Sequence, residues 1–179
     1  MSKNILILAA SPRANGNSDS LSKQFLEGAK AAGNEVELVF LREKKIAYCI
    51  ACDGCKRNPG ICIHKDDMSA ILEKMILADV IVLATPVYFY TMDAQMKTLI
   101  DRTVARYTEI CDKEFYFIVT AADPNVEAME RTIEGFRGFT ACLDGAKERD
   151  VIYGTGAWNK GEIEDLPVMQ TAYETGKLV

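Results

Sequence analysis

The feature that most constrains the fold of this chain is a regular alternation of short apolar runs with longer amphipathic segments. Five runs have the composition of β-strands, and they span residues 4–10, 35–41, 79–84, 114–120 and 149–154. The first, Asn4–Ala10, is apolar almost throughout, which is typical of a strand buried on both faces. Strands that alternate with helices form parallel sheets, because each crossover carries a helix. The sequence therefore predicts an α/β protein with a parallel sheet covered by helices on both faces.

Amphipathic spacing predicts helices over residues 20–32, 68–76, 91–107, 126–143 and 164–177. Asp123 and Pro124 have the residue types of an N-cap and a first helical position, so we expect them to begin the fourth helix. No internal repeat, low-complexity tract or linker interrupts the pattern. We therefore expect one domain, residues 1–179, with a cysteine-rich insertion at about 42–65.

Charge and hydropathy exclude several functional classes. Lys and Arg number 21 against 26 Asp and Glu, so the net charge is −5, and a nucleic acid or an anionic membrane is not expected as a partner. No apolar run approaches the roughly 20 residues that span a bilayer. The N-terminus lacks the length and cleavage pattern of a secretory signal, so the sequence predicts a cytoplasmic protein.

The loop after the first strand, residues 11–18, has the composition of a phosphate-binding loop. It reads Ser-Pro-Arg-Ala-Asn-Gly-Asn-Ser and leads into a helix N-terminus, where backbone N–H groups and the helix dipole favour an anion. Neither the dinucleotide pattern G-x-G-x-x-G nor the G-K-[ST] of a P-loop follows this strand. A mononucleotide phosphate is the ligand that fits best. The alternative is a polar loop in which Ser18 only caps the helix.

These motifs resemble the flavodoxin-like NAD(P)H-dependent FMN reductases. The resemblance rests on Ser11-Pro12-Arg13 with Gly16-Asn17-Ser18, on Ala84–Phe89, and on Lys97 with Asp101-Arg102. It implies a flavodoxin-like three-layer sandwich in which the five parallel strands have the order 2-1-3-4-5. It also implies an FMN-dependent oxidoreductase, with NAD(P)H as a co-substrate. We expect Lys97, Asp101 and Arg102 to be structural rather than catalytic.

The resemblance also implies which residues bind FMN, and no side chain of the chain is expected to be catalytic, since the flavin carries the chemistry. The phosphate would be held by Ser11, Arg13, Asn17 and Ser18. The ribityl chain and ring would be bordered by Pro86, Val87, Tyr88, Phe89, Thr120 and Ala121. For Phe89 and Tyr90, packing on the sheet end or at the surface is an equally good interpretation.

A second signal is the spacing Cys49-x2-Cys52-x2-Cys55-x6-Cys62. The C-x2-C-x2-C triplet supplies three ligands to a [4Fe–4S] cluster in ferredoxin-type sequences, and Cys62 is near enough to be the fourth. Basic residues outnumber acidic ones in this segment, which suits an anionic cluster. Zinc, redox-active thiols and disulfides are the alternatives.

The cysteine motif and the following Asp66-Asp67 resemble the archaeal and bacterial iron–sulfur flavoproteins, in which such a loop lies beside the FMN of a partner subunit. Cys111 and Cys142 stand apart, and we expect them to be buried apolar residues on helical segments. His64 is the only histidine and is expected to be exposed to solvent, which argues against a Ser/Cys–His hydrolase.

The sequence therefore predicts an FMN-dependent oxidoreductase that transfers electrons from NAD(P)H or a reduced carrier to a small acceptor such as a flavin or quinone. A [4Fe–4S] cluster would relay single electrons to a ferredoxin-like protein. The alternative is a non-enzymatic electron carrier or a thiol redox sensor. By resemblance, we expect a homodimer or homotetramer.

Overall fold

The structure is a computed structural model, and it describes residues 2–179. Its sheet is built from β1 (Asn4–Ala9), β2 (Glu35–Phe40), β3 (Val80–Tyr88), β5 (Glu114–Thr120) and β6 (Lys147–Gly154). These five strands are all parallel and lie in the order β2-β1-β3-β5-β6. Numbered along the chain without the short β4, this is the expected order 2-1-3-4-5. The two-residue β4 (Thr91–Met92) adds an antiparallel pairing to the end of β3.

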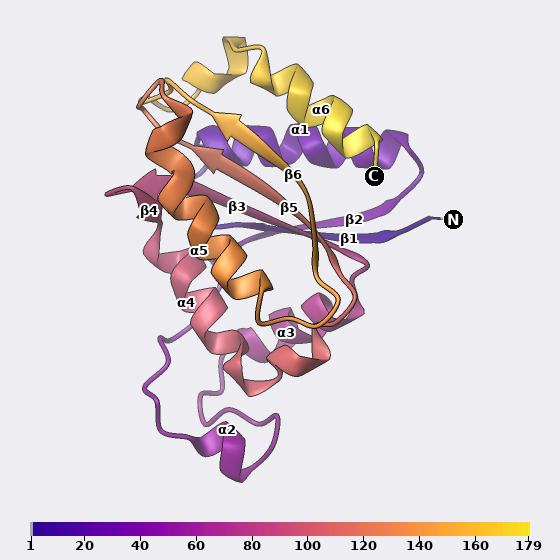
Figure 1. The fold of residues 1–179 in the computed structure, drawn as a ribbon, viewed down its shortest axis with the longest axis vertical. Coiled ribbons are helices and arrows are strands. Elements are labelled where there is room, and N and C mark those ends of the chain that lie inside the picture. Colours follow the sequence, from indigo (N-terminus) through magenta and orange to yellow (C-terminus); the bar gives the residue numbers. More distant parts are fainter. Residues whose placement is uncertain (1) are drawn as a thin grey trace.

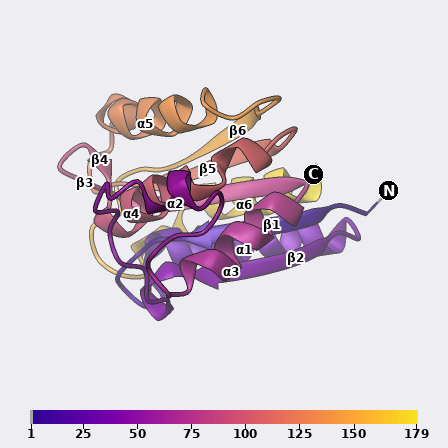
Figure 2. The same cartoon turned by 90° about the horizontal axis from the view of Figure 1, so that it is seen from below.

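Helices cover both faces of this sheet, which gives the three layers of a flavodoxin-like sandwich (Figure 1). On one face lie α1 (Asn17–Ala31) and α6 (Val168–Lys177). On the other lie α3 (Met68–Leu77), α4 (Ala94–Arg102) and α5 (Glu130–Thr140). Figure 2 shows α3 beside the β1–β2 side of the sheet and α5 beside β6. The one-turn helix α2 (Gly54–Arg57) lies away from the sheet, in the cysteine-rich segment.

Successive side chains of the central strands point to opposite faces of the sheet and pack into two separate hydrophobic cores. Leu6, Ile81 and Phe117 pack with α3, α4 and α5, whereas Ile7 and Val82 pack with Phe25 of α1 and its neighbours on the opposite face. All five of these side chains on the strands are essentially inaccessible to solvent. Their burial on both faces explains why the strands are apolar runs rather than alternating ones.

Several predicted boundaries were wrong. The expected loop Thr85–Tyr90 belongs mostly to β3, and the expected helix 91–107 begins at Ala94 and ends at Arg102, followed by two 3₁₀ turns. Asp123 and Pro124 do not begin a helix. Asp123 accepts a hydrogen bond from the backbone N–H of Asn125 in a local turn. A 3₁₀ turn then spans Val126–Met129, at the predicted start of the helix, and α5 follows from Glu130.

Glycine sets the approach of α1 to α6. A Cβ on Gly28 would lie 1.9 Å from the carbonyl oxygen of Tyr173, and one on Gly176 would lie 2.1 Å from that of Phe25. Both atoms are backbone and cannot move without separating the helices. The two helices therefore pack directly, backbone against backbone.

We predict that Gly28→Ala destabilises the protein by about 2 kcal/mol, because overpacking outweighs the better helix propensity of alanine. Urea unfolding followed by circular dichroism measures this. Gly138→Ala in α5 is the matched control, since a Cβ there meets no atom within 4 Å. The control should be stabilised by about 0.5 kcal/mol. Equal effects at both positions would contradict close helix contact.

Candidate functional site

The loop between β1 and α1 encloses a cradle of backbone and hydroxyl groups. The Ser11 hydroxyl accepts a hydrogen bond from the Arg13 N–H, and the Gly16 N–H donates to the Arg13 carbonyl. A Cβ on Gly16 would lie 2.7 Å from Ser11 Oγ, so only glycine fits this turn without displacing Ser11. α1 begins at Asn17 rather than at the expected Ser20. The unpaired amides of its first turn therefore face the loop.

Ser18 is the most informative residue of this loop. Its side chain is 1% exposed, and its hydroxyl has no hydrogen-bond partner although it lines the adjoining cavity. A buried hydroxyl without a partner is costly in a native protein. An anion bound at the helix N-terminus would supply the missing acceptor.

A buried ion pair supports the loop from behind. The Asp19 carboxylate is fully buried and accepts hydrogen bonds from the Asn15 N–H at 2.9 Å and from Arg42 Nη1 at 2.8 Å. Burial raises the pKa of Asp19, while Arg42 and the Asn15 amide oppose the rise. Arg42 also lies over the Phe40 ring at 4.2 Å. These contacts hold Asn15 in its left-handed conformation, with φ of 54°.

The cavity beside this loop has a volume of about 430 Å³, within the roughly 300–1,000 Å³ of small-molecule sites. Loops at the carboxyl ends of β1, β3, β5 and β6 surround it. Its lining includes all ten residues expected to bind FMN: Ser11, Arg13, Asn17, Ser18, Pro86, Val87, Tyr88, Phe89, Thr120 and Ala121. Five further residues line it that the sequence did not single out for binding: Gly16, Ala122, Ala157, Trp158 and Lys160.

The aromatic side of the cavity is a tight hairpin rather than a loop. Val87 pairs with Met92 and Tyr88 with Thr91, so Phe89 and Tyr90 form a two-residue turn. Both have positive φ, 50° and 64°, as a type I′ turn requires. Such values are strained for aromatic residues, and they leave the Phe89 side chain 100% exposed at the rim. The chain thus presents aromatic surface beside the cavity at a conformational cost.

Asp93 fixes the base of this hairpin. Its carboxylate caps α4 by accepting the Met96 N–H at 3.0 Å, and its own N–H donates to Thr85 Oγ1 at 3.1 Å. The side chain is 1% exposed, and its second oxygen has no partner. Burial therefore raises the pKa of Asp93 to about 6, although the Met96 N–H and the Thr85 hydroxyl, which favour the ionised carboxylate, oppose the shift.

The four clustered cysteines line a second, smaller cavity of about 170 Å³, together with His64 and Arg102. All six cysteines of the chain are free thiols in this structure. Within residues 2–179, no three His, Cys, Asp or Glu side chains are close enough to bind one metal ion. The segment therefore places four thiols around one cavity without bringing them to metal-binding distances. Ala51 and Asp53 have positive φ, 52° and 54°, in this segment.

Arg102 anchors the cysteine-rich segment to α4. Its guanidinium forms a two-pronged pair with Asp66, at 2.7 and 3.0 Å, and lies 3.5 Å from the Sγ of Cys62. Burial disfavours the ionised form of Asp66, but hydrogen bonds from Arg102 and from the Ala47 and Met68 amides outweigh it and lower its pKa to about 2. Arg102 is thus structural, as expected. Lys97 and Asp101 form an exposed ion pair at 2.6 Å on the surface of α4, which agrees with the structural role expected for them.

Three expectations about single residues were wrong. His64 is half-buried rather than exposed, and its Nε2 is buried without a partner. Cys142 is exposed in the turn after α5, where its thiol donates to the Gly138 carbonyl at 3.4 Å. Cys111 is half-buried and lies in an irregular segment before β5. Neither cysteine is a helical core residue.

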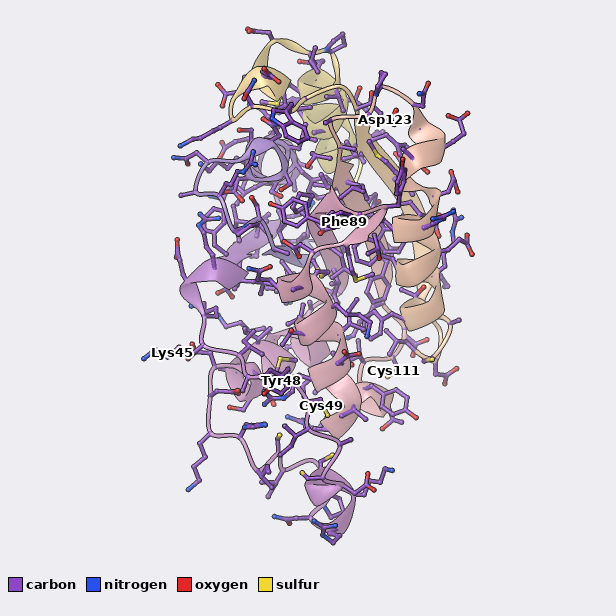
Figure 3. All side chains as sticks on the ribbon, turned by 90° about the vertical axis from the view of Figure 1, so that its left-hand side faces the viewer. Lys45, Tyr48, Cys49, Phe89, Cys111 and Asp123 are labelled. Carbon is purple, nitrogen blue, oxygen red and sulfur yellow. The ribbon has the colours of Figure 1, made fainter. Side chains whose placement is uncertain are left out.

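The two cavities share no lining residue. In Figure 3, Cys49 and Tyr48 lie at the far end of α4 from Phe89, which marks the rim of the larger cavity. Within one chain, the thiols and the aromatic hairpin are therefore separate sites.

The geometry agrees with what comparison with known proteins shows. Residues 3–141 match the family described as NADPH-dependent FMN reductase. The chain belongs to this family. It is 33% identical over 178 residues to an iron–sulfur flavoprotein of Methanosarcina thermophila, a match that covers 95% of this chain and 90% of the relative. This places the FMN reductase-family protein in the iron–sulfur flavoprotein branch, and makes it an FMN-dependent oxidoreductase.

Two further matches agree with this assignment. An iron–sulfur flavoprotein of Archaeoglobus fulgidus is 39% identical over 95 residues, which is 53% of this chain and 43% of the relative. A crystal structure of an azoreductase from Bacillus anthracis superposes with a TM-score of 0.73 and covers 100% of both chains, at 18% identity. At that identity the superposition supports the fold alone.

We predict that Asp93→Asn removes a pH dependence of stability. The pKa of Asp93 is about 6 in the folded state against 3.8 as the reference, so the folded protein binds the extra proton between these values. Stability therefore falls as pH rises from about 4 to 6, and the penalty persists above that range. Asn can still cap the helix but carries no buried charge. The free energy of unfolding of the variant, relative to that of the wild type, should therefore be about 2 kcal/mol higher at neutral pH than near pH 4.

Urea unfolding of both proteins at pH 4.5 and 7.5 measures this difference. Asp101→Asn removes an exposed carboxylate from the same helix and should leave the pH dependence intact. An unchanged pH dependence in Asp93→Asn would show that the buried carboxyl does not titrate in this range.

We further predict that Asp66→Ala loosens the cysteine-rich segment. It leaves the Arg102 guanidinium buried without its counter-charge, which costs about 3 kcal/mol. Cleavage by trypsin at Lys44, Lys45, Lys56 or Arg57 should accelerate. Asp53→Ala, which removes an exposed pair with Lys56, is the control and should change cleavage little. Equal cleavage in both variants would contradict the anchoring role of Asp66.

Proposed function

We propose that this protein binds FMN in the larger cavity and transfers electrons from NAD(P)H or a reduced carrier to a small acceptor such as a flavin or quinone. The observation that carries the proposal is the buried, unpartnered Ser18 hydroxyl at a helix N-terminus, in a cavity whose other side is aromatic. A phosphorylated flavin requires both features, the first for its phosphate and the second for its aromatic ring.

The residues of the cavity fit FMN in three parts. Ser11, Ser18 and the first amides of α1 would hold the phosphate, with Arg13 adding charge at the rim. Thr120 and Ala121 would border the ring system opposite Tyr88 and Phe89. When bound, FMN supplies the chemistry, because it accepts a hydride and releases electrons singly or in pairs. No side chain is needed as a general base.

The donor set of the smaller cavity fits an iron–sulfur cluster. Cys49, Cys52, Cys55 and Cys62 would be its ligands, and a [4Fe–4S] cluster would supply one-electron transfer. Arg102 already faces Cys62 and would offset the negative charge of the thiolates. Because the thiols do not approach one another closely enough here, cluster binding requires the loop to close around it.

A second candidate function is an electron carrier or thiol sensor without its own substrate. The four free thiols of the smaller cavity favour it, since Cys49 is exposed and the other three are only half-buried, so that they are accessible to oxidation. A zinc ion bound by the four thiols is a third candidate for the smaller cavity.

Two proposals concern the setting of the activity. We place the protein in the cytoplasm, where six free thiols persist. We also propose a homodimer or homotetramer, with a ferredoxin-like protein or a small molecule as the redox partner. The separation of the two cavities within one chain supports an oligomer, because a neighbouring subunit would have to bring thiols and flavin together.

None of the helices in residues 2–179 combines the length and apolar character that a membrane crossing demands.

The phosphate site is tested by comparing FMN with riboflavin, which lacks the phosphate. Ser18→Ala should raise the Kd of FMN about tenfold and leave that of riboflavin unchanged, since it removes one hydrogen bond to a charged group. Ser22→Ala is the control, because that hydroxyl is buried in the same helix and donates to the Ser18 carbonyl. Equal loss for both flavins would place the phosphate elsewhere.

An absorption spectrum of the wild-type protein, reconstituted anaerobically with FMN, iron and sulfide, distinguishes the candidate functions. Flavin bands with a broad shoulder at longer wavelength that dithionite bleaches would support flavin and cluster together. A flavin spectrum without iron or acid-labile sulfide would favour the thiol sensor. NAD(P)H bleaching of the flavin, followed by reoxidation with a quinone, would support the enzyme. Absence of flavin binding would overturn the proposed function.

A further inference from the structure

The side chain of Asn17 makes contacts that the phosphate site does not explain. Its Nδ2 donates to the carbonyls of Ala157 at 3.1 Å and Asn159 at 3.0 Å, and its Oδ1 accepts the N–H of Gly161 at 3.1 Å. Both amide hydrogens and the acceptor are therefore used by one segment, residues 157–161. This segment is called the strap below. The Asn17 amide has no donor left for a phosphate.

Other side chains fix the strap as well. Arg13 Nη1 donates to the Trp158 carbonyl at 3.2 Å, and the Glu162 carboxylate accepts the N–H groups of Trp158 and Asn159, each at 2.8 Å. The strap is neither helix nor strand, so these side chains satisfy backbone groups that secondary structure would otherwise pair. Its conformation is thus set by the phosphate loop, some 140 residues away in sequence.

The strap presents one large apolar side chain to the larger cavity. Trp158 lines that cavity, yet its indole is 69% exposed. It is the only tryptophan of the chain. An exposed indole held on a fixed backbone at a cavity rim is suited to contact a flat ligand ring. Nothing else in the described chain covers it.

We propose that Asn17 is a positioning residue, which holds the strap so that Trp158 forms a wall of the flavin site. The proposal rests on FMN binding in the larger cavity and assigns Asn17 a role different from direct phosphate binding. Its backbone N–H remains available to the phosphate at the first helical position of α1.

Only an asparagine fits this position among residues of similar size. The three contacts require two donors and one acceptor in a single planar group, which the Asn amide provides. Aspartate has no donor for the Ala157 and Asn159 carbonyls and would add negative charge beside the phosphate loop. Both Asn17→Ala and Asn17→Asp should therefore release the strap.

The test is a double-mutant cycle on flavin affinity. Trp158→Ala should raise the Kd of both FMN and riboflavin about tenfold, because it removes a ring contact rather than a phosphate contact. Trp158→Phe should retain most of the affinity. Asn17→Ala should give a similar loss for both flavins, and the double variant should be no worse than either single one. Gln170→Ala, an exposed amide on α6, is the matched control.

A second readout separates positioning from a general loss of stability. Indole in contact with a flavin quenches its fluorescence, so the lifetime of bound riboflavin should lengthen several-fold in Trp158→Ala and in Asn17→Ala. Additive effects of the two substitutions, or unchanged lifetimes, would overturn the proposal while leaving FMN binding intact. Because the indole is exposed, Trp158→Ala should fold normally even where Asn17→Ala does not. Failure of the wild-type protein to bind either flavin would overturn the proposed function itself.

Discussion

The site depends on the reversal of strand order between β1 and β3. The chain leaves β1 through α1 on one face of the sheet and leaves β3 through α4 on the other, so the two loops diverge at the carboxyl ends of adjacent strands. A parallel sheet with right-handed crossovers opens a crevice only at such a point. The phosphate loop and the aromatic hairpin are the two sides of this crevice. The residues of each segment determine what it can bind, but the sheet topology determines that the two segments lie side by side.

Two buried ion pairs extend this arrangement to the cysteine-rich segment. Arg42 stands at its beginning and pairs with Asp19 behind the phosphate loop, whereas Asp66 stands at its end and pairs with Arg102 of α4. A buried pair is costly to break, because the remaining charge is left without compensation. The segment is thus fixed at both ends and irregular between them. The two pairs therefore fix where the segment lies on the fold, while no regular sheet or long helix sets the backbone around the thiols.

The sequence predicted most of the sheet because burial on both faces leaves a direct mark on composition. The bounds of β5 were predicted to the residue, and those of β1 and β2 to within one. The β3–β4 hairpin was missed for an equally physical reason. Two-residue turns with positive φ are normally marked by Asn-Gly or Asp-Gly, and here Phe89 and Tyr90 take those conformations against their own preference. Strain supported by tertiary contacts leaves no trace in local propensity.

The strap was not predicted to bind the flavin, because the residues expected to bind FMN all came from the segments after strands one, three and four. The rule that ligands lie outside the carboxyl ends of strands applies equally to the last strand, and it would have included Trp158 and Lys160. What no local rule provides is the use of the Asn17 amide, whose partners lie 140 to 144 residues away in sequence. Hydrogen bonds between loops produce no periodic pattern and no characteristic composition in the sequence. A polar residue in a binding motif can therefore act on the protein itself, and only its three-dimensional contacts distinguish that role from ligand binding.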